Sequence, residues 1–173
     1  MSWWSRPRHW RRARSQARVG SPAARLVVEL TGRPGGIYRL EDSLLTDEFT
    51  VEDLAQAVAA AGRHALVVDG GEVSDKASFI AAVGRAGAFP GWSGQNWDAL
   101  QDSLSDLSWS RAGGYVVLFS DPARFARASP QDWSVAADVF SSVAGWWSDR
   151  DVGFHVLLLD DDPRLFTAFT PIS

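Results

Sequence analysis

Residues 115–120 read Tyr-Val-Val-Leu-Phe-Ser, a run in which apolar side chains follow one another without alternating polar ones. Residues 64–69 (HALVVD) and 154–159 (FHVLLL) have the same character. Strands buried on both faces are apolar throughout, whereas strands with one face in water alternate. Helical patterns between these segments supply the crossovers that parallel strands need. The sequence therefore predicts an α/β fold with a small three-stranded parallel sheet covered by helices.

Several helices are indicated by apolar residues at helical spacing behind a capping residue. Residues 51–61 follow Thr50, a good N-cap, and residues 94–107 form a second helix. Ser129 and Pro130 are a favourable N-cap and first-turn pair, and they open a longer helix.

The segment before the first buried strand is interpreted as an N-terminal extension. Residues 25–30 (RLVVEL) form a β-branched run before a Gly/Pro-rich turn, which predicts a strand. Residues 37–40 are expected to pair back on it as a hairpin, ahead of the helix at 51–61. The predicted organisation is a basic, disordered head at 1–24, the extension at 25–61, a central domain at 62–160 and a C-terminal tail at 161–173.

Composition and charge limit the class of protein. The chain has 173 residues, of which 46% are hydrophobic, which suits one globular domain. It lacks cysteine, which excludes disulfides and thiolate chemistry. Residues 1–25 hold seven arginines and no acid, so within the net charge of −4 residues 26–173 carry −11. We expect the body to bind cations and the head to bind anions. No apolar run is long enough to span a membrane.

Motifs for catalysis or metal binding are not found. None of the three histidines, His9, His64 and His155, has a second histidine at i+3 or i+4. Residues 91–95 fail the G-x-S-x-G pattern because position 95 is glutamine, and no phosphate-binding glycine motif occurs. The three aspartates at 160–162 are interpreted as a solvated strand end. No catalytic residue, metal or cofactor is predicted.

The helix predicted at 94–107 carries a row of carboxylates. Its apolar face, expected to be buried, is composed of Trp97, Leu100, Leu104 and Leu107. Asp98, Asp102 and Asp106 lie one turn apart on another face, with no basic residue between them. Like charges at this spacing destabilise a helix. The row suits a solvated face, a surface for a cationic partner, or a hydrolytic carboxylate pair.

Residues 89–104 read FPGWSGQNWDALQDSL, and here the chain resembles a known family. They resemble the signature of the barstar family, the intracellular protein inhibitors of barnase-type ribonucleases. That pattern is an apolar residue and proline, an aromatic, and then G-x-N-x-D-A-L-x-D-x-L. The resemblance extends over residues 62–160. It implies a barstar-like fold, a cytoplasmic inhibitor that is not an enzyme, and a basic extracellular ribonuclease or related toxin as partner.

The resemblance also implies which residues bind the partner. The implied surface is Trp92, Gly94, Asn96, Asp98, Gln101 and Asp102. Asp102 would take the place of a substrate phosphate, and Asp98 would pair with a nuclease arginine. Trp92 would pack on the nuclease, whereas Gln101 stands where the family has an aromatic contact.

Two alternatives follow from the residues themselves. A hydrolase would use Asp98 and Asp102 as its carboxylate pair and would need a cleft beside the helix. A nucleic-acid-associated protein would act through the head, where arginine and tryptophan are interleaved. The acidic body favours the inhibitor, because complementary charge speeds association with a basic partner.

Overall fold

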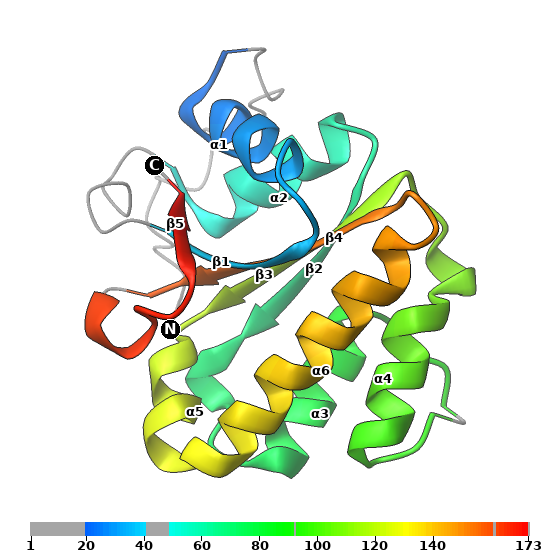
Figure 1. The fold of residues 1–173 in the computed structure, drawn as a ribbon, viewed down its shortest axis with the longest axis vertical. Coiled ribbons are helices and arrows are strands. Elements are labelled where there is room, and N and C mark those ends of the chain that lie inside the picture. The colour runs from blue at the N-terminus through cyan, green and yellow to red at the C-terminus, as the bar shows by residue number, and fades with distance from the viewer. Residues whose placement is uncertain (1–19, 41–48, 92, 161, 173) are drawn as a thin grey trace, which may run out of the picture.

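The computed structural model describes residues 20–40, 49–91, 93–160 and 162–172. They form a sheet of five strands in which all neighbouring strands are parallel (Figure 1). The strands are β1 (Gly36–Leu40), β2 (His64–Asp69), β3 (Gly114–Ser120), β4 (Gly153–Leu159) and β5 (Thr170–Ile172). Their order across the sheet is β2-β3-β4-β1-β5.

The three strands predicted from continuous apolar runs are confirmed as β2, β3 and β4, which are adjacent. β3 and β4 are buried along almost their whole length because helices cover both faces. β2 is an edge strand, and its Val67 side chain is 43% exposed. The predicted number of strands was too small, because β1 pairs with β4 on one side and with β5 on the other.

Residues 25–30 are not a strand, and this prediction was wrong: they belong to helix α1 (Pro22–Thr31). The Ser21 side chain accepts a hydrogen bond from the Ala24 amide at 3.1 Å and caps the helix. The residues that α1 buries recur at helical spacing and are Ala23, Leu26, Val27 and Leu30. The β-branched composition favoured a strand, but the cap and the amphipathic period favour the helix.

The predicted N-terminal hairpin was also wrong. With α1 in place of its first strand, β1 has no hairpin partner. Instead β1 runs parallel to β4, with Ile37 opposite Val156, and parallel to β5, with Leu40 opposite Ile172. The extension and the C-terminal residues therefore enlarge the same sheet.

Helices lie on both faces of the sheet (Figure 1). They are α1, α2 (Val51–Ala60), α3 (Lys76–Ala86), α4 (Trp97–Asp106), α5 (Pro122–Ala128) and α6 (Pro130–Ser148). α1 and α2 cover one face, and the other four cover the opposite face. The predicted helices at 51–61, 94–107 and from Pro130 are confirmed, the second beginning at Trp97. In the described ranges, every helix is too short or too polar to cross a membrane.

Candidate functional site

Helix α4 is held firmly on its inner side. Leu100, Leu104 and Leu107 are fully buried, which confirms the predicted apolar face. The Trp147 indole of α6 donates a hydrogen bond to the Leu104 carbonyl at 2.9 Å. Trp97 packs on the core with its ring centre 5.9 Å from that of Phe79. These contacts fix the orientation of α4 and leave its other side facing solvent.

The beginning of α4 is set by Asn96. Its side-chain oxygen accepts a hydrogen bond from the Ala99 amide at 2.8 Å, which makes Asn96 the N-cap. This oxygen satisfies one of the amides that a helix leaves unpaired at its first turn. In the structure Asn96 therefore has a local role in the start of the helix as well as an exposed position.

The loop before α4 lies directly against the helix. A Cβ added at Gly94 would come within 2.8 Å of the Ala99 Cβ, closer than two carbon atoms can approach without movement. The hydroxyls of Ser93 and Ser103 are 3.3 Å apart and join the loop to α4. A side chain at position 94 would force the loop or the helix to shift, which gives glycine, the first residue of the signature G-x-N, a packing reason here.

The carboxylate row is exposed, as predicted. Asp98, Asp102 and Asp106 all face solvent, and within the described part of the chain none of them forms an ion pair. Neighbouring members are one helical turn apart, about 5–6 Å between Cβ atoms. Asp98 lies in the first turn, where the helix dipole favours an anion, whereas Asp106 is the last residue, where the dipole opposes one.

A hollow of about 260 Å³ lies between α4 and the preceding loop. It is lined by Ser93, Gly94, Ala99, Asp102, Ser103 and Asp106. Asp98 is not part of this lining, so Asp98 and Asp102 do not share this cleft. The hydrolase alternative would require both carboxylates to face the same cleft. The carboxylate that accompanies Asp102 there is Asp106.

The residues predicted to bind a partner are mostly together on this surface. Gly94, Asn96, Asp98, Gln101 and Asp102 are all exposed within one loop and the first turns of α4. Trp92 lies outside the described residues.

Sequence reasoning missed the hollow and therefore the part that Ser93, Ser103 and Asp106 have in it. The small side chains at 99 and 103, spaced like Asp102 and Asp106, were a signal that could have indicated it.

The aspartates after β4 are not simply solvated, so that interpretation was wrong for Asp160. This residue is 7% exposed, and its carboxylate accepts hydrogen bonds from the Ala123 and Asp162 amides, each at 2.7 Å. Asp162 is paired with Arg127 and Arg164. The hydrogen bond from Arg164 holds the pKa of Asp162 below its ordinary value. Among the residues that the structure describes, no group of three or more His, Cys, Asp or Glu side chains is placed to hold a metal ion.

His155 is a buried residue of β4, 1% exposed. Its Nε2 lies 3.0 Å from the Arg33 carbonyl oxygen, and Nδ1 has no hydrogen-bond partner in the described structure. Burial lowers the pKa of His155, while the hydrogen bond to Arg33 acts in the opposite direction. The ring therefore favours its neutral form and serves the fold.

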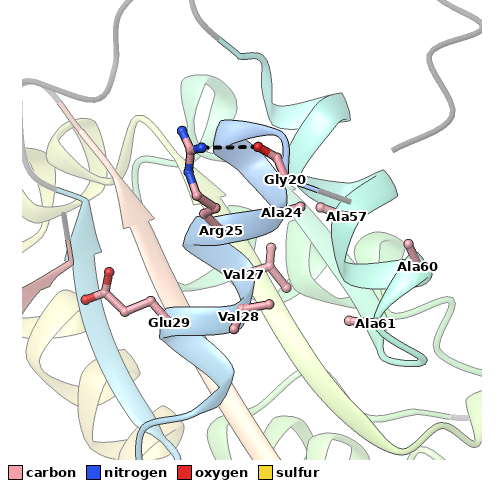
Figure 2. A pocket seen from close by; sticks show the side chains of 9 residues that line it. All are labelled: Gly20, Ala24, Arg25, Val27, Val28, Glu29, Ala57, Ala60 and Ala61. Atoms are coloured by element: carbon pink, nitrogen blue, oxygen red, sulfur yellow. Dashed lines mark hydrogen bonds between the residues drawn. The ribbon is translucent and has the colours of Figure 1, made fainter. Parts of the chain in front are cut away.

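A larger groove of about 420 Å³ lies between α1 and α2, on the other face of the sheet (Figure 2). Val28 of α1, 68% exposed, faces the small residues of α2 across it. The opposite side is formed by Ala57 and Ala60 of α2 and by Ala61, which follows the helix. The two charged residues of the lining are engaged locally: Arg25 donates to the Gly20 carbonyl, and Glu29 pairs with Arg33. The groove offers apolar surface and no free acid–base pair.

The described residues define a parallel α/β protein with an exposed acidic helix. The family model of barstar, described as a barnase inhibitor, matches residues 63–159. This match covers more than half of the 173 residues, and the chain belongs to the barstar family. No curated protein matches the sequence. The alternative in which the head binds nucleic acid concerns residues 1–24, of which residues 1–19 lie outside the described ranges.

Proposed function

We propose that this chain is a barstar-like inhibitor that blocks the active site of a small basic ribonuclease with the exposed side of α4. The observation that carries the proposal is a row of three exposed aspartates, without ion-pair partners among the described residues, on a helix whose other side is fixed in the core. Membership of the barstar family supports it. The inhibitor would perform no chemistry and would act inside the cell that makes the nuclease.

Asp102 is the central anchor of this proposal. It lies in the middle of the row, and its carboxylate would take the place of a substrate phosphate among the cationic groups of the nuclease. A carboxylate that accepts charge-assisted hydrogen bonds from such groups is held more strongly than a neutral acceptor. Asp98 would pair with a nuclease arginine, and the exposed Gly94, Asn96 and Gln101 would complete the contact around the row, together with Trp92.

The charge of the body supports the same partner. Residues 26–173 carry −11, which would draw a basic nuclease toward the inhibitor and raise the association rate. This attraction is screened over about 8 Å at physiological ionic strength. The association rate should therefore fall as salt is added, while contacts at Asp102 determine mainly how slowly the complex dissociates.

The test is a titration of the full chain into barnase and other small guanyl-specific ribonucleases, with RNA cleavage as the readout. We expect inhibition that is complete at one inhibitor per nuclease. Asp102→Ala should lose at least ~2 kcal/mol of binding, about thirtyfold, a general scale for anchor residues to which the barnase–barstar pair itself contributes.

The control is Glu52→Ala, which removes an exposed carboxylate from α2 on the opposite face of the sheet. It should inhibit like the unmodified chain. A loss below ~0.5 kcal/mol in Asp102→Ala would remove Asp102 from the anchor role. Absence of inhibition across the panel would refute the assignment to these nucleases.

A further inference from the structure

The hollow beside α4 has the size of a site for one side chain. Its volume of about 260 Å³ lies below the roughly 300–1,000 Å³ of pockets that enclose whole small molecules. The hollow exists because its inner surface is built from glycine, alanine and two serines. The loop lies close to the helix here: a Cβ added at Gly94 would come within 2.8 Å of the Ala99 Cβ, and the hydroxyls of Ser93 and Ser103 are 3.3 Å apart.

The charges around the hollow select a cation. Asp102 and Asp106 both line it, and neither has an ion-pair partner among the described residues. Asp106 is also the last residue of α4, where the negative end of the helix dipole adds to its charge. For the isolated helix this position is unfavourable, because Asp106 is repelled by the dipole and by Asp102.

An organic cation suits the hollow better than a metal ion. Within the described residues no group of three or more His, Cys, Asp or Glu side chains could hold a metal ion, and the hollow has only two carboxylates in its lining. An arginine guanidinium presents five N–H donors in a planar fork and can bond two carboxylates at once. The hydroxyls of Ser93 and Ser103 are further acceptors at the same place.

We infer that this hollow receives one arginine side chain of the partner, and that Asp106 is a specificity-determining residue beside the Asp102 anchor. The inference rests on the proposed function for the identity of the partner. It adds a third charged contact, after Asp98 and Asp102, toward the C-terminal end of α4 and outside the surface that the family resemblance implies. A nuclease without a basic residue at the matching place would be bound less well.

The first experiment measures binding of the full chain to barnase and to the same ribonuclease panel. Asp106→Asn keeps the shape of the side chain and removes its charge. The matched control is Glu52→Gln, which removes one charge from the opposite face of the sheet. We expect Asp106→Asn to bind at least ~tenfold more weakly than the control to every nuclease that the chain inhibits, mainly through faster dissociation.

The second experiment needs no nuclease. Arginine methyl ester is titrated into the full chain, and the amide NMR signals of Gly94 and Ser103 are followed. We expect saturable shifts in the unmodified chain and about two- to fivefold weaker binding in Asp106→Asn, within the range of a single exposed ion pair. Glycine methyl ester, which has the ester and the amine without the guanidinium, is the control ligand.

The outcomes separate the two proposals. If Asp106→Asn behaves like Glu52→Gln while Asp102→Ala abolishes inhibition, the arginine site is refuted and the inhibitor stands. If no nuclease is inhibited but arginine methyl ester shifts the signals in an Asp106-dependent way, the inhibitor is refuted and the site stands. If there is neither inhibition nor a shift, both are refuted.

Discussion

Neutralising the carboxylate row should stabilise the folded chain, because the row works against its own helix. Asp102 is one turn from both Asp98 and Asp106, and all three are exposed. Each like-charge pair at this spacing costs about 0.2–0.5 kcal/mol. Asp102→Asn removes both pairs, so we expect a gain of about 0.4–1.0 kcal/mol in the free energy of unfolding. Asparagine and aspartate have similar helix propensity, so the change isolates the charge.

The two ends of the row should behave differently. Asp106→Asn removes one repulsive pair and an unfavourable interaction with the helix C-terminus, which together contribute about 0.5–1.5 kcal/mol. Asp98→Asn also removes one pair, but it loses a favourable interaction in the first turn, so we expect little net change. The expected order of stability is Asp106→Asn and Asp102→Asn above Asp98→Asn.

Urea unfolding at low ionic strength measures these differences, and repeating it in 1 M salt checks their origin. The Debye length falls from about 30 Å at 0.01 M to about 3 Å at 1 M, so the gains should largely disappear. A loss of stability in Asp102→Asn or Asp106→Asn would refute the reasoning. It would mean that the carboxylate already makes a stabilising contact and is not free for a partner.

Two further predictions concern the cap of α4 and the buried histidine. Asn96→Ala removes the acceptor of the Ala99 amide and should cost about 0.5–2 kcal/mol of stability, whereas Asn96→Asp should retain it; equal urea midpoints for all three proteins would contradict the capping role. Because the folded-state pKa of His155 is lowered by burial, its contribution to stability is present above the unfolded value of 6.5 and is lost as pH falls toward the folded value. Between pH 7.5 and 5.5 the free energy of unfolding of the unmodified chain should fall by up to about 1.4 kcal/mol more than that of His155→Gln. Parallel pH profiles of the two proteins would contradict this.

Local patterns predicted most of the central fold correctly. The apolar runs of β2, β3 and β4 required burial on both faces whatever their neighbours were, so their type followed from composition. The helix carrying the aspartates followed from its period, and so did its buried and exposed sides. The barstar signature lies in this local part of the chain, and the family model confirms it.

The errors fell where two local signals conflicted or where the partner was distant. In α1 the β-branched residues favoured a strand, while Ser21 and Pro22 carried the stronger signal of a helix start. β5 has three residues and only one of them, Ile172, is buried. Its sequence has too little periodicity to identify it, and it becomes a strand because β1 offers it a free edge.

The candidate site likewise has one part that local patterns predict and one part that they do not. The row of Asp98, Asp102 and Asp106 could be predicted because residues four apart share a helix face. The hollow could not be predicted, because it depends on how closely the loop at Ser93 and Gly94 lies against Ala99 and Ser103. That approach changes the grouping of the carboxylates from a uniform row to a pair beside a cavity.

The sequence by itself determined which segments are apolar throughout, that the aspartates lie on a helix, and which side of that helix carries negative charge. These properties depend on neighbours within a few residues, whose spacing the backbone geometry sets. The tertiary structure alone decided that β1 lies between β4 and β5, that His155 is buried, and that Asp102 and Asp106 share a hollow. Each of these results depends on contacts between separate elements, such as two strands or a loop and a helix. The packing and hydrogen bonding between such elements leave no pattern within one local stretch of sequence.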